Sequence, residues 1–226
     1  METMEYNQWH LWNVRIDEPI VTITDLLVSV VCFLAASFLF KIKPKSKVLK
    51  SFRLYFLLMG FATLFGGIFG HAIYYILGPA WKLPGWLISM LSIVFIERAA
   101  IFHSAKIFKP KWIKILSWIN IIEFIIFLFL TLYTLNFSFV EYHAAYGMLV
   151  VVLSLEGYLF FKTRNLSSKI ILWGNGFVAL AGLVFMNEWS IHTWFNHLSL
   201  SHTLMAVAAL LFYKAVKVMA NDEGIE

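Results

Sequence analysis

The sequence contains a single cysteine, Cys32, and few charged residues for its length of 226. One cysteine excludes a disulfide within the chain. Asp, Glu, Lys and Arg make up 14% of the residues, whereas a soluble domain carries about a quarter. The chain also lacks the basic start, short apolar core and small-residue cleavage site of a secretory signal. We therefore expect the first twenty residues to belong to the mature protein.

Long apolar runs dominate the rest of the sequence. Hydrophobic residues make up 61% of the chain and aromatic residues 18%. Seven segments are long enough to cross a bilayer at about 20 residues each, and they span residues 21–40, 54–77, 84–104, 113–134, 139–161, 169–188 and 199–218. Backbone polar groups in lipid must be satisfied within each segment, and no alternating barrel pattern occurs. We predict an all-α, polytopic membrane protein in which residues 1–226 form one seven-transmembrane helix bundle.

Basic residues are distributed unevenly among the predicted connections. Arg15 and Lys82 fall on one side and Arg98 falls within a segment, whereas the other fifteen gather on the opposite side. These are Lys41, Lys43, Lys45, Lys47, Lys50, Arg53, Lys106, Lys109, Lys111, Lys114, Lys162, Arg164, Lys169, Lys214 and Lys217. Because cytoplasmic connections collect Lys and Arg, we expect an extracytoplasmic tail 1–20, a cytoplasmic tail 219–226 and residence in a bacterial inner membrane. The net charge of +5 then reports orientation, and membrane lipids, not nucleic acid, are the expected partners.

Polar side chains from distant parts of the chain fall at the predicted outer ends of the segments. They are Asp25, His71, Glu141, His143, Asn187, Glu188, His192, His197 and His202. Neutral imidazole is a common zinc ligand, and three histidines leave a fourth position for water or substrate. We predict a zinc site on His71, His197 and His202. Asp25 and Glu188 are the predicted catalytic carboxylates, which would orient a ligand or move protons.

The spacing of the last two histidines leaves two local structures open. Residues five apart lie about 140° apart around a continuous helix, so His197 and His202 would face different directions. If Ser199 is the N-cap, His197 precedes the helix and folds back toward His202. If Asn196 is the N-cap, both histidines lie in the helix on divergent faces.

A second group of ionisable residues lies deeper in the predicted spans. It consists of Glu97, Arg98, Glu123 and Glu156. Charged groups at this depth are costly and usually pair inside the bundle, so we expect Arg98 to bridge to Glu123 or Glu156. A structural bridge is favoured over a proton pathway. By contrast, His10, His143 and His192 are expected to lie in the lipid headgroup region, and His103 is assigned no role.

The run Gly67-Ile68-Phe69-Gly70-His71 and the histidines of Phe195-Asn196-His197-Leu198-Ser199-Leu200-Ser201-His202 resemble the seven-helix superfamily of alkaline ceramidases and progestin/adiponectin receptors. The resemblance implies zinc on one histidine of the second helix and two of the seventh, and hydrolysis of a lipid amide. The second run also resembles an uncharacterised bacterial seven-helix family that has Phe-Asn-His-Asn-Asp. Three features differ from the superfamily: Gly67 stands where it has serine, the last histidines are five apart instead of four, and its third-helix aspartate has no match.

These observations leave hypotheses from several classes. The first is a zinc-dependent hydrolase that acts on a lipid amide or ester near the outer leaflet. The second, motivated by the missing serine and aspartate, is a non-enzymatic binder or sensor of lipid or a small molecule, with a structural or vestigial metal site. A haem-binding electron carrier using His71 with His143 or His202 is a third. A retinal protein is disfavoured, because Lys214 and Lys217 lie at the inner end of the last segment.

Overall fold

The computed structural model describes residues 7–42 and 46–222. In this part of the chain, seven helical spans are long and apolar enough to cross a membrane, which confirms the predicted all-α membrane protein. They are built from α1 (Pro19–Lys41); α2 (Lys47–Phe65) with η1 (Gly66–Ala72); η2 (Pro79–Trp81), α4 (Lys82–His103) and η3 (Ser104–Lys106); α5 (Pro110–Thr134); α6 (Ser138–Ala145), η4 (Tyr146–Val152) and α7 (Leu153–Thr163); α8 (Leu166–Met186); and α9 (His197–Asp222). The short α3 (Tyr74–Leu77) joins the second and third spans.

Each predicted segment overlaps one of these spans, but the second span begins at Lys47 and ends at Ala72, earlier at both ends than the predicted segment 54–77. Ser46 caps α2 by accepting a hydrogen bond from the Leu49 amide. Helix therefore forms through the basic residues that precede position 54. Similarly, α9 continues to Asp222, so the start of the predicted tail 219–226 is helical. Lys43, Lys45 and residues 223–226 lie outside the described residues.

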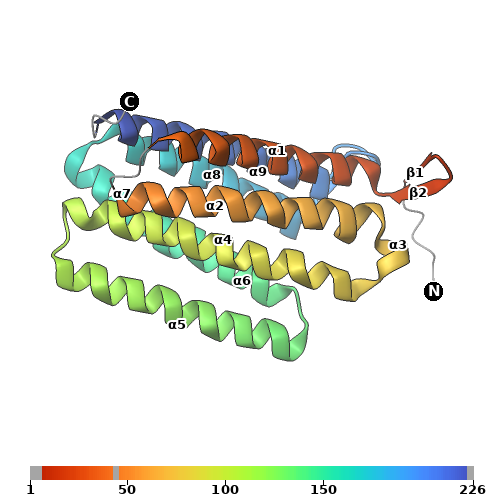
Figure 1. Ribbon diagram of the computed structural model, residues 1–226, viewed down its shortest axis with the longest axis horizontal. Coiled ribbons are helices and arrows are strands. Elements are labelled where there is room, and N and C mark those ends of the chain that lie inside the picture. The colour runs from red at the N-terminus through yellow and green to blue at the C-terminus, as the bar shows by residue number, and fades with distance from the viewer. Residues whose placement is uncertain (1–6, 43–45, 223–226) are drawn as a thin grey trace.

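The spans pack as neighbours along the chain with one closure between its two ends (Figure 1). α1 packs against α2 and also against α9, α2 packs against α4, and α8 packs against α9. Buried Phe56, Phe212 and Cys32 belong to the apolar core that these helices share. The contact between α1 and α9 brings the first span beside the last.

The fourth span, α5, occupies the edge of the bundle (Figure 1). Its buried residues are Asn120, Glu123 and Thr131, and all three are polar. Large apolar side chains such as Ile122, Ile126 and Phe129 are more than half exposed on its outer side. Apolar packing does not favour another helix over lipid, whereas interhelical hydrogen bonds do favour association. Polar contacts therefore hold α5 against the bundle.

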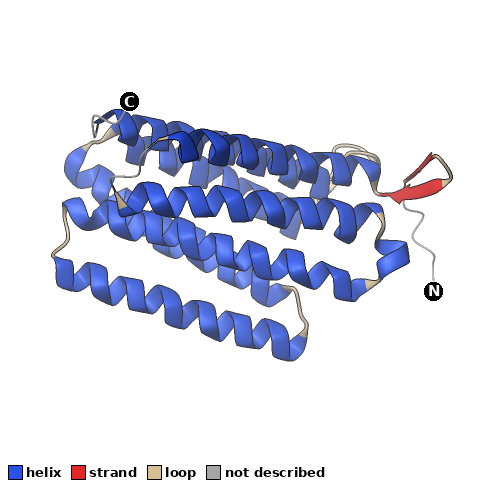
Figure 2. Cartoon of the chain, viewed as in Figure 1, coloured by secondary structure: helices blue, strands red, loops and turns tan. Residues whose placement is uncertain are grey.

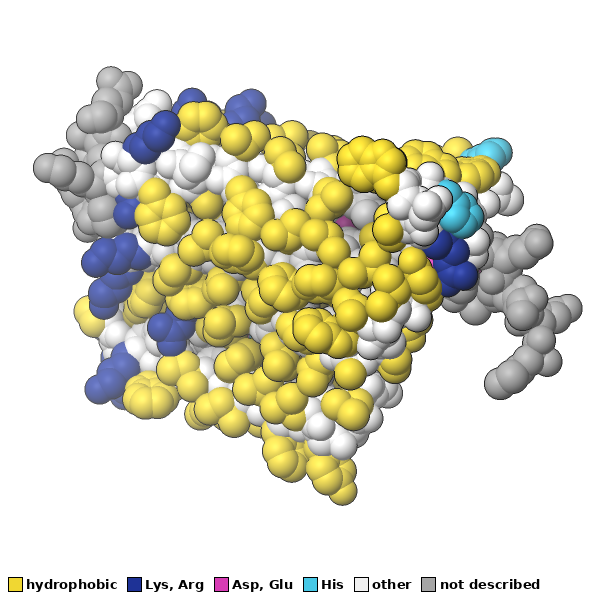
Figure 3. All heavy atoms as spheres, turned by 45° about the vertical axis from the view of Figure 1, so that its right-hand side comes forward, with side chains coloured by type: hydrophobic (Ala, Val, Ile, Leu, Met, Phe, Trp, Pro, Cys, Tyr) yellow, Lys and Arg dark blue, Asp and Glu magenta, His cyan; other side chains and the backbone are white. Residues whose placement is uncertain are grey.

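The surface separates into an apolar middle and a basic end. Figure 3 shows hydrophobic side chains over the length of the visible face and Lys and Arg side chains gathered mainly at one end. The strands lie at the opposite end of the molecule from the end of α9 (Figure 1). An apolar belt with charge restricted to its ends is the surface expected of a protein that crosses a bilayer.

A small β-hairpin precedes the first span (Figure 2). Strand β1 (Gln8–Leu11) pairs antiparallel with β2 (Val14–Asp17), and the turn residues Trp12 and Asn13 both have positive φ. Positive φ at both central residues is typical of a type I′ turn, which matches the twist of paired strands. The Asn7 side-chain amide donates to the Thr193 carbonyl at 2.7 Å. The hairpin is thus hydrogen-bonded to the connection between α8 and α9. The sequence did not predict the hairpin, because strands of four residues are too short to show an alternating pattern.

Two spans contain a turn of π-helix, η1 and η4. In η1, the Ile73 amide donates to the Ile68 carbonyl, five residues earlier, at 3.0 Å. A π-turn holds one more residue than an α-turn and often occurs at functional sites. η1 contains His71, and η4 lies beside α4, so both wide turns fall near buried ionisable residues.

We expect Gly174→Ala to destabilise the protein by about 1–3 kcal/mol through overpacking. A Cβ at Gly174 would lie 2.6 Å from the ring of Phe212, which is fully buried and cannot move away. Gly176 on the same helix has open space, so Gly176→Ala is the matched control, and improved helix propensity should stabilise it by about 0.5–1 kcal/mol. Thermal unfolding of both variants in one detergent measures the difference. Equal shifts would contradict the packing of α8 against α9.

Candidate metal site

Asp25, His71 and His202 meet at the end of the bundle that carries the hairpin. They come from α1, η1 and α9, and one potential ligand atom of each lies within 4.8 Å of the others. Asp25 stands six residues into α1, about 9 Å along the helix at 1.5 Å per residue. The side chains are 7% exposed for Asp25, 16% for His71 and 15% for His202. The group is sheltered from solvent but not sealed.

The Asp25 carboxylate lies between the two imidazoles. Its Oδ1 is 3.6 Å from His202 Nε2, and its Oδ2 is 4.0 Å from His71 Nε2. The two rings meet edge to face with centroids 6.0 Å apart. Both histidines therefore turn the same nitrogen, Nε2, toward one carboxylate.

The other ring nitrogen of each histidine is held by a side chain near the start of α1. His71 Nδ1 lies 2.8 Å from Glu18 Oε2. His202 Nδ1 lies 3.4 Å from Thr24 Oγ1, and that hydroxyl donates to the Ile20 and Val21 carbonyls. The Glu18 carboxylate can only accept a hydrogen bond, and the Thr24 hydroxyl already donates its proton to the backbone. Each Nδ1 must therefore carry the proton in its contact. The Nε2 lone pairs then remain available to a cation.

The backbone around Glu18 explains how it reaches His71. Glu18 follows β2 directly and has φ of 45°, and its amide donates to the Asn7 carbonyl. Burial raises the pKa of the Glu18 carboxyl, but the hydrogen bond from His71 and the electrostatic influence of His71, Lys82 and His197 outweigh burial and leave this pKa below its usual value. A lowered pKa means that the stabilisation from this contact is present at neutral pH and is lost as pH falls through the lowered pKa.

Two glycines of η1 allow α1 to approach the site. A Cβ at Gly66 would lie 2.9 Å from Asp25 Oδ2, and one at Gly67 would lie 3.2 Å from the Asp25 Cβ and 3.3 Å from the Thr22 carbonyl. Only hydrogen at these positions leaves room for the carboxylate. By contrast, a Cβ at Gly70 would lie no closer than 3.9 Å to a neighbouring atom, which belongs to Lys82. The close contact with α1 therefore involves Gly66 and Gly67.

The structure does not bring His197 into this group. The Asn196 side chain accepts a hydrogen bond from the Ser199 amide at 3.1 Å, so Asn196 is the N-cap and α9 begins at His197. His197 and His202 consequently lie on divergent faces of one helix. The His197 ring packs against Phe185 with centroids 6.0 Å apart. Of the predicted ligand set, His71 and His202 are together, and Asp25 takes the third place.

Glu188, the other predicted catalytic carboxylate, is exposed after the end of α8. It has φ of 53°, and its carbonyl accepts from the Ser190 hydroxyl. It is not part of the group formed by Asp25, His71 and His202. The sequence pointed to Glu188 because it shares a depth with the histidines, but depth does not determine which side of the bundle a side chain faces.

The three residues fit a zinc ion in donor type, and their ligand atoms lie close to one another. Zinc takes imidazole nitrogen and carboxylate oxygen at about 2.0–2.2 Å in tetrahedral geometry, which places ligand atoms about 3.4 Å apart. The contacts of 3.6 and 4.0 Å involve different oxygens of Asp25, and one ligand atom of each residue lies within 4.8 Å of the others, which is wider than that separation. Two imidazoles and one carboxylate leave one tetrahedral position for another ligand.

The model of a family of unknown function, DUF6962, matches residues 20–221. The chain belongs to the DUF6962 family. No curated protein and no solved structure matches it.

This DUF6962 protein has a second buried group of ionisable residues, between α4, α5 and α6. Glu97, Glu123 and His143 offer ligand atoms within 4.8 Å of one another. His143 Nε2 lies 3.0 Å from the Met90 carbonyl, which can only accept, so this nitrogen carries a proton. Its Nδ1 lies 3.1 Å from Glu123 Oε2, and a proton must bridge that contact too. His143 and Glu123 thus share a proton as a salt bridge or as a neutral pair.

Asn120 extends this network. Its amide donates to Glu97 Oε2 at 3.0 Å, and its carbonyl oxygen accepts from Arg98 Nε at 2.9 Å. The sequence predicted a bridge from Arg98 to Glu123 or Glu156, and this prediction is wrong, because Arg98 pairs with Asn120. A Cβ at Gly147 in η4 would lie 2.4 Å from Glu97 Oε1, so this glycine makes space for the carboxyl.

A third buried pair lies near the basic end. Glu156 Oε1 lies 2.9 Å from His103 Nδ1, and Glu156 Oε2 accepts a hydrogen bond from the Ser168 hydroxyl at 2.6 Å. His103 was assigned no role from sequence, because the sequence does not reveal that α4 and α7 bring these two residues together. His143 was expected among headgroups, yet it is fully buried. His10 and His192 are exposed.

Glu18 and the histidine partners of the buried carboxylates are the residues that sequence reasoning missed. The residue counts could have indicated these pairs, because the spans contain several acids and several histidines but few lysines or arginines away from their ends. A buried carboxylate needs a partner, and histidine was the commonest candidate. Assigning each pair nevertheless requires the rotation of each helix, which hydropathy does not provide.

The contact between Glu123 and His143 can be measured with a double-mutant cycle. We expect His143→Ala to cost about 3–5 kcal/mol, because it leaves a buried acid without its partner. Adding Glu123→Gln should recover part of that loss, with a coupling energy of about 0.5–3 kcal/mol. Chemical unfolding in detergent of the two single variants and the double variant gives the cycle. Purely additive losses would argue against the pair.

Proposed function

We propose that this protein binds one zinc ion through Asp25, His71 and His202 and uses it to hydrolyse an amide or ester bond of a membrane lipid. The observation that carries the proposal is the orientation of the two imidazoles. Each has Nδ1 held by an oxygen acceptor and Nε2 directed at the same carboxylate. Histidines that bind metal commonly have their second nitrogen fixed in this way.

Each residue around the site has a role in this proposal. Asp25, His71 and His202 would hold the ion, and Glu18 and Thr24 would keep both rings in the tautomer that binds it. Zinc would supply a Lewis acid and a water activated near neutral pH. The Glu18 carboxylate, ionised at neutral pH because of its lowered pKa, would increase the basicity of the His71 ring.

The surroundings favour a lipid over a water-soluble substrate. The group lies about 9 Å along α1, inside the apolar part of the chain. Trp12 and Ile191, which are 91% and 72% exposed, stand on the hairpin and on the connection before α9. Exposed tryptophan is typical of a membrane interface. With the basic end in the cytoplasm, as the Lys and Arg distribution indicates, the site would open toward the outer leaflet.

A second candidate function is a non-enzymatic lipid or small-molecule binder with a structural metal site. One specific observation favours it. Asp25, predicted as a proton carrier, stands among the ligands instead, and Glu188 is exposed and outside the group. In the described chain, Glu18 is then the carboxylate nearest the ligands, and it is engaged by His71. This arrangement suits stable metal binding with no group dedicated to proton transfer.

The ligand assignment predicts which variants lose zinc. Purified protein should contain about one zinc per chain, and Asp25→Asn, His71→Ala and His202→Ala should each lose it, because each removes one of three ligands. His197→Ala should retain it, because His197 lies on another face of α9. Metal analysis by mass spectrometry, with chromatographic profile and thermal unfolding as folding checks, tests all four variants.

Two results would refute this assignment. One is full zinc content in the Asp25, His71 and His202 variants, and the other is loss of zinc in folded His197→Ala. Glu18→Gln serves as a graded variant that keeps all ligands. Removal of its charge should weaken zinc binding by about 10–100-fold without abolishing it. Competition with a chelator of known affinity measures that change.

Catalysis is tested separately from metal binding. Zinc-loaded protein should release fatty acid from at least one lipid in a broad panel of amides and esters, and a chelator should stop the release. His202→Ala should be inactive, whereas His197→Ala should remain active. Zinc binding with no turnover across the panel would reject the hydrolase and support the second candidate function.

A further inference from the structure

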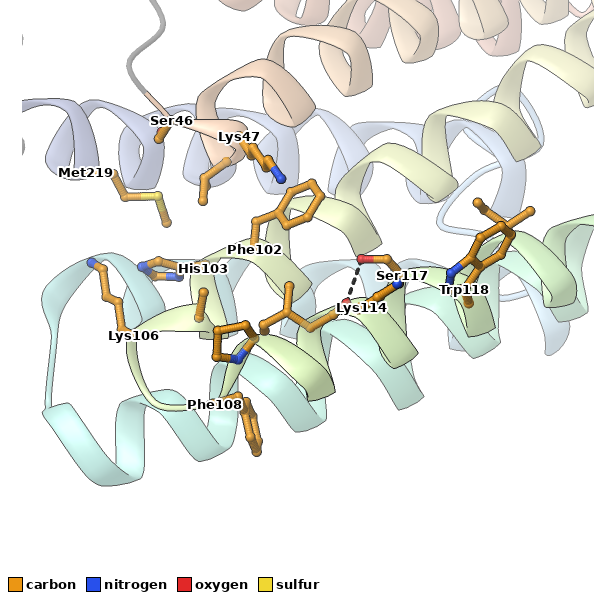
Figure 4. Close-up of a pocket in the computed structure, with 15 residues that line it drawn as sticks. Ser46, Lys47, Phe102, His103, Lys106, Phe108, Lys114, Ser117, Trp118 and Met219 are labelled. Atoms are coloured by element: carbon orange, nitrogen blue, oxygen red, sulfur yellow. Dashed lines mark hydrogen bonds between the residues drawn. The ribbon is translucent and has the colours of Figure 1, made fainter.

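A groove of about 790 Å³ opens at the basic end, between the start of α2, the end of α4 and the start of α5 (Figure 4). It is distant in sequence and in the fold from Asp25, His71 and His202, which lie at the hairpin end. Pockets of about 300–1,000 Å³ hold a molecule of drug size. The groove is therefore large enough for a lipid headgroup and the first part of its acyl chains.

Three lysines from three elements surround this groove. Lys47 comes from the first turn of α2, Lys106 from η3 and Lys114 from the second turn of α5. Lys47 Nζ lies 5.3 Å from the ring centroid of Phe102. Among described residues, no carboxylate lies within ion-pair distance of these ammonium groups. The groove thus presents positive charge without a described acidic partner.

A buried histidine also lines the groove. His103 is 2% exposed, and its Nε2 has no hydrogen-bond partner within the described protein. Its Nδ1 is already engaged by Glu156. Figure 4 shows His103 on the same side of the groove as Lys106, near Met219. A buried nitrogen without a partner suggests a bound group that the chain itself does not supply.

The remaining wall is apolar and continues onto the lipid-facing side of α5. It includes Phe102, Ile113, Trp118 and Ile121. Trp118 is 57% exposed, so this wall reaches the outer surface of the bundle. A small soluble anion would leave these side chains uncovered, whereas an acyl chain would cover them.

We propose that this groove binds one anionic phospholipid, with the phosphate among Lys47, Lys106 and Lys114 and an acyl chain along Trp118 and Ile121. Basic pockets between transmembrane helices recognise anionic headgroups through such charge complementarity. His103 lines the groove near Lys106, and α5 contributes both a lysine and the apolar wall. The bound lipid fills the gap between α5 and the start of α2.

The test compares two variants with the same change in charge. K106Q/K114Q removes two groove lysines, and K162Q/K169Q removes two lysines of α7 and α8 that do not line the groove. The full chain is exchanged into bilayers of phosphatidylcholine with phosphatidylglycerol as the minor component. Native mass spectrometry then counts retained lipid. We expect the wild-type chain and K162Q/K169Q to retain one phosphatidylglycerol, and K106Q/K114Q to lose affinity by roughly fivefold for each lysine.

Ser117→Phe is a second variant that leaves every charge in place. Ser117 lines the groove and donates to the Ile113 carbonyl, as the dashed line in Figure 4 marks. A phenyl ring there should block the acyl chain and also release phosphatidylglycerol. Thermal unfolding confirms that the variants remain folded.

Three outcomes would overturn the proposal. Equal losses in the two double variants would mean that only the general basic potential attracts the lipid. Equal retention of phosphatidylcholine would exclude recognition of the negative headgroup. Displacement of phosphatidylglycerol by inorganic phosphate at the same concentration would mean that the groove recognises the phosphate ion and not the lipid.

Discussion

The close contact between α1 and the glycines of η1 is the constraint on which the candidate site depends. Asp25 can lie between His71 and His202 only because Gly66 and Gly67 present no side chain toward it. The same contact places Thr24, one residue earlier, beside His202, and brings Glu18 over His71. One helix–helix approach therefore sets both the ligand positions and the hydrogen bonds that orient the rings.

Carboxylates in this bundle are paired mainly with histidine. Glu18 and Asp25 contact His71 or His202, Glu123 contacts His143, and Glu156 contacts His103. In lipid, a fixed ion pair of Arg and Glu must remain desolvated and charged, which is costly. A histidine and a carboxylic acid can instead share one proton and remain neutral. These pairs supply directional contacts between helices at a lower desolvation cost.

The fold was largely predictable, because each span must satisfy its own backbone and cover itself with apolar residues. The site was predictable only in part. His71 and His202 could be grouped from their depth, but Asp25 replaced His197 because Asn196, not Ser199, caps α9. Both caps were chemically reasonable. The choice matters because the side-chain direction rotates by about 100° with each helical residue, so an earlier start of α9 turns His197 away from His202. Likewise, the partners of Arg98, His103 and His143 depend on helix rotation, which apolar spans with weak periodicity do not encode.

The π-turn at η1 has a consequence for the direction in which the second span presents His71. In a regular α-helix, successive side chains differ in direction by about 100°, so each position faces a fixed direction. An added residue in a π-turn rotates everything beyond it by about 100°. The regular part of the second span, α2, packs against both α1 and α4, while its last turns stay beside α1 and bring His71 to Asp25 and His202. The π-turn therefore changes the direction of the side chains at the end of the span without altering how α2 packs inside the bundle.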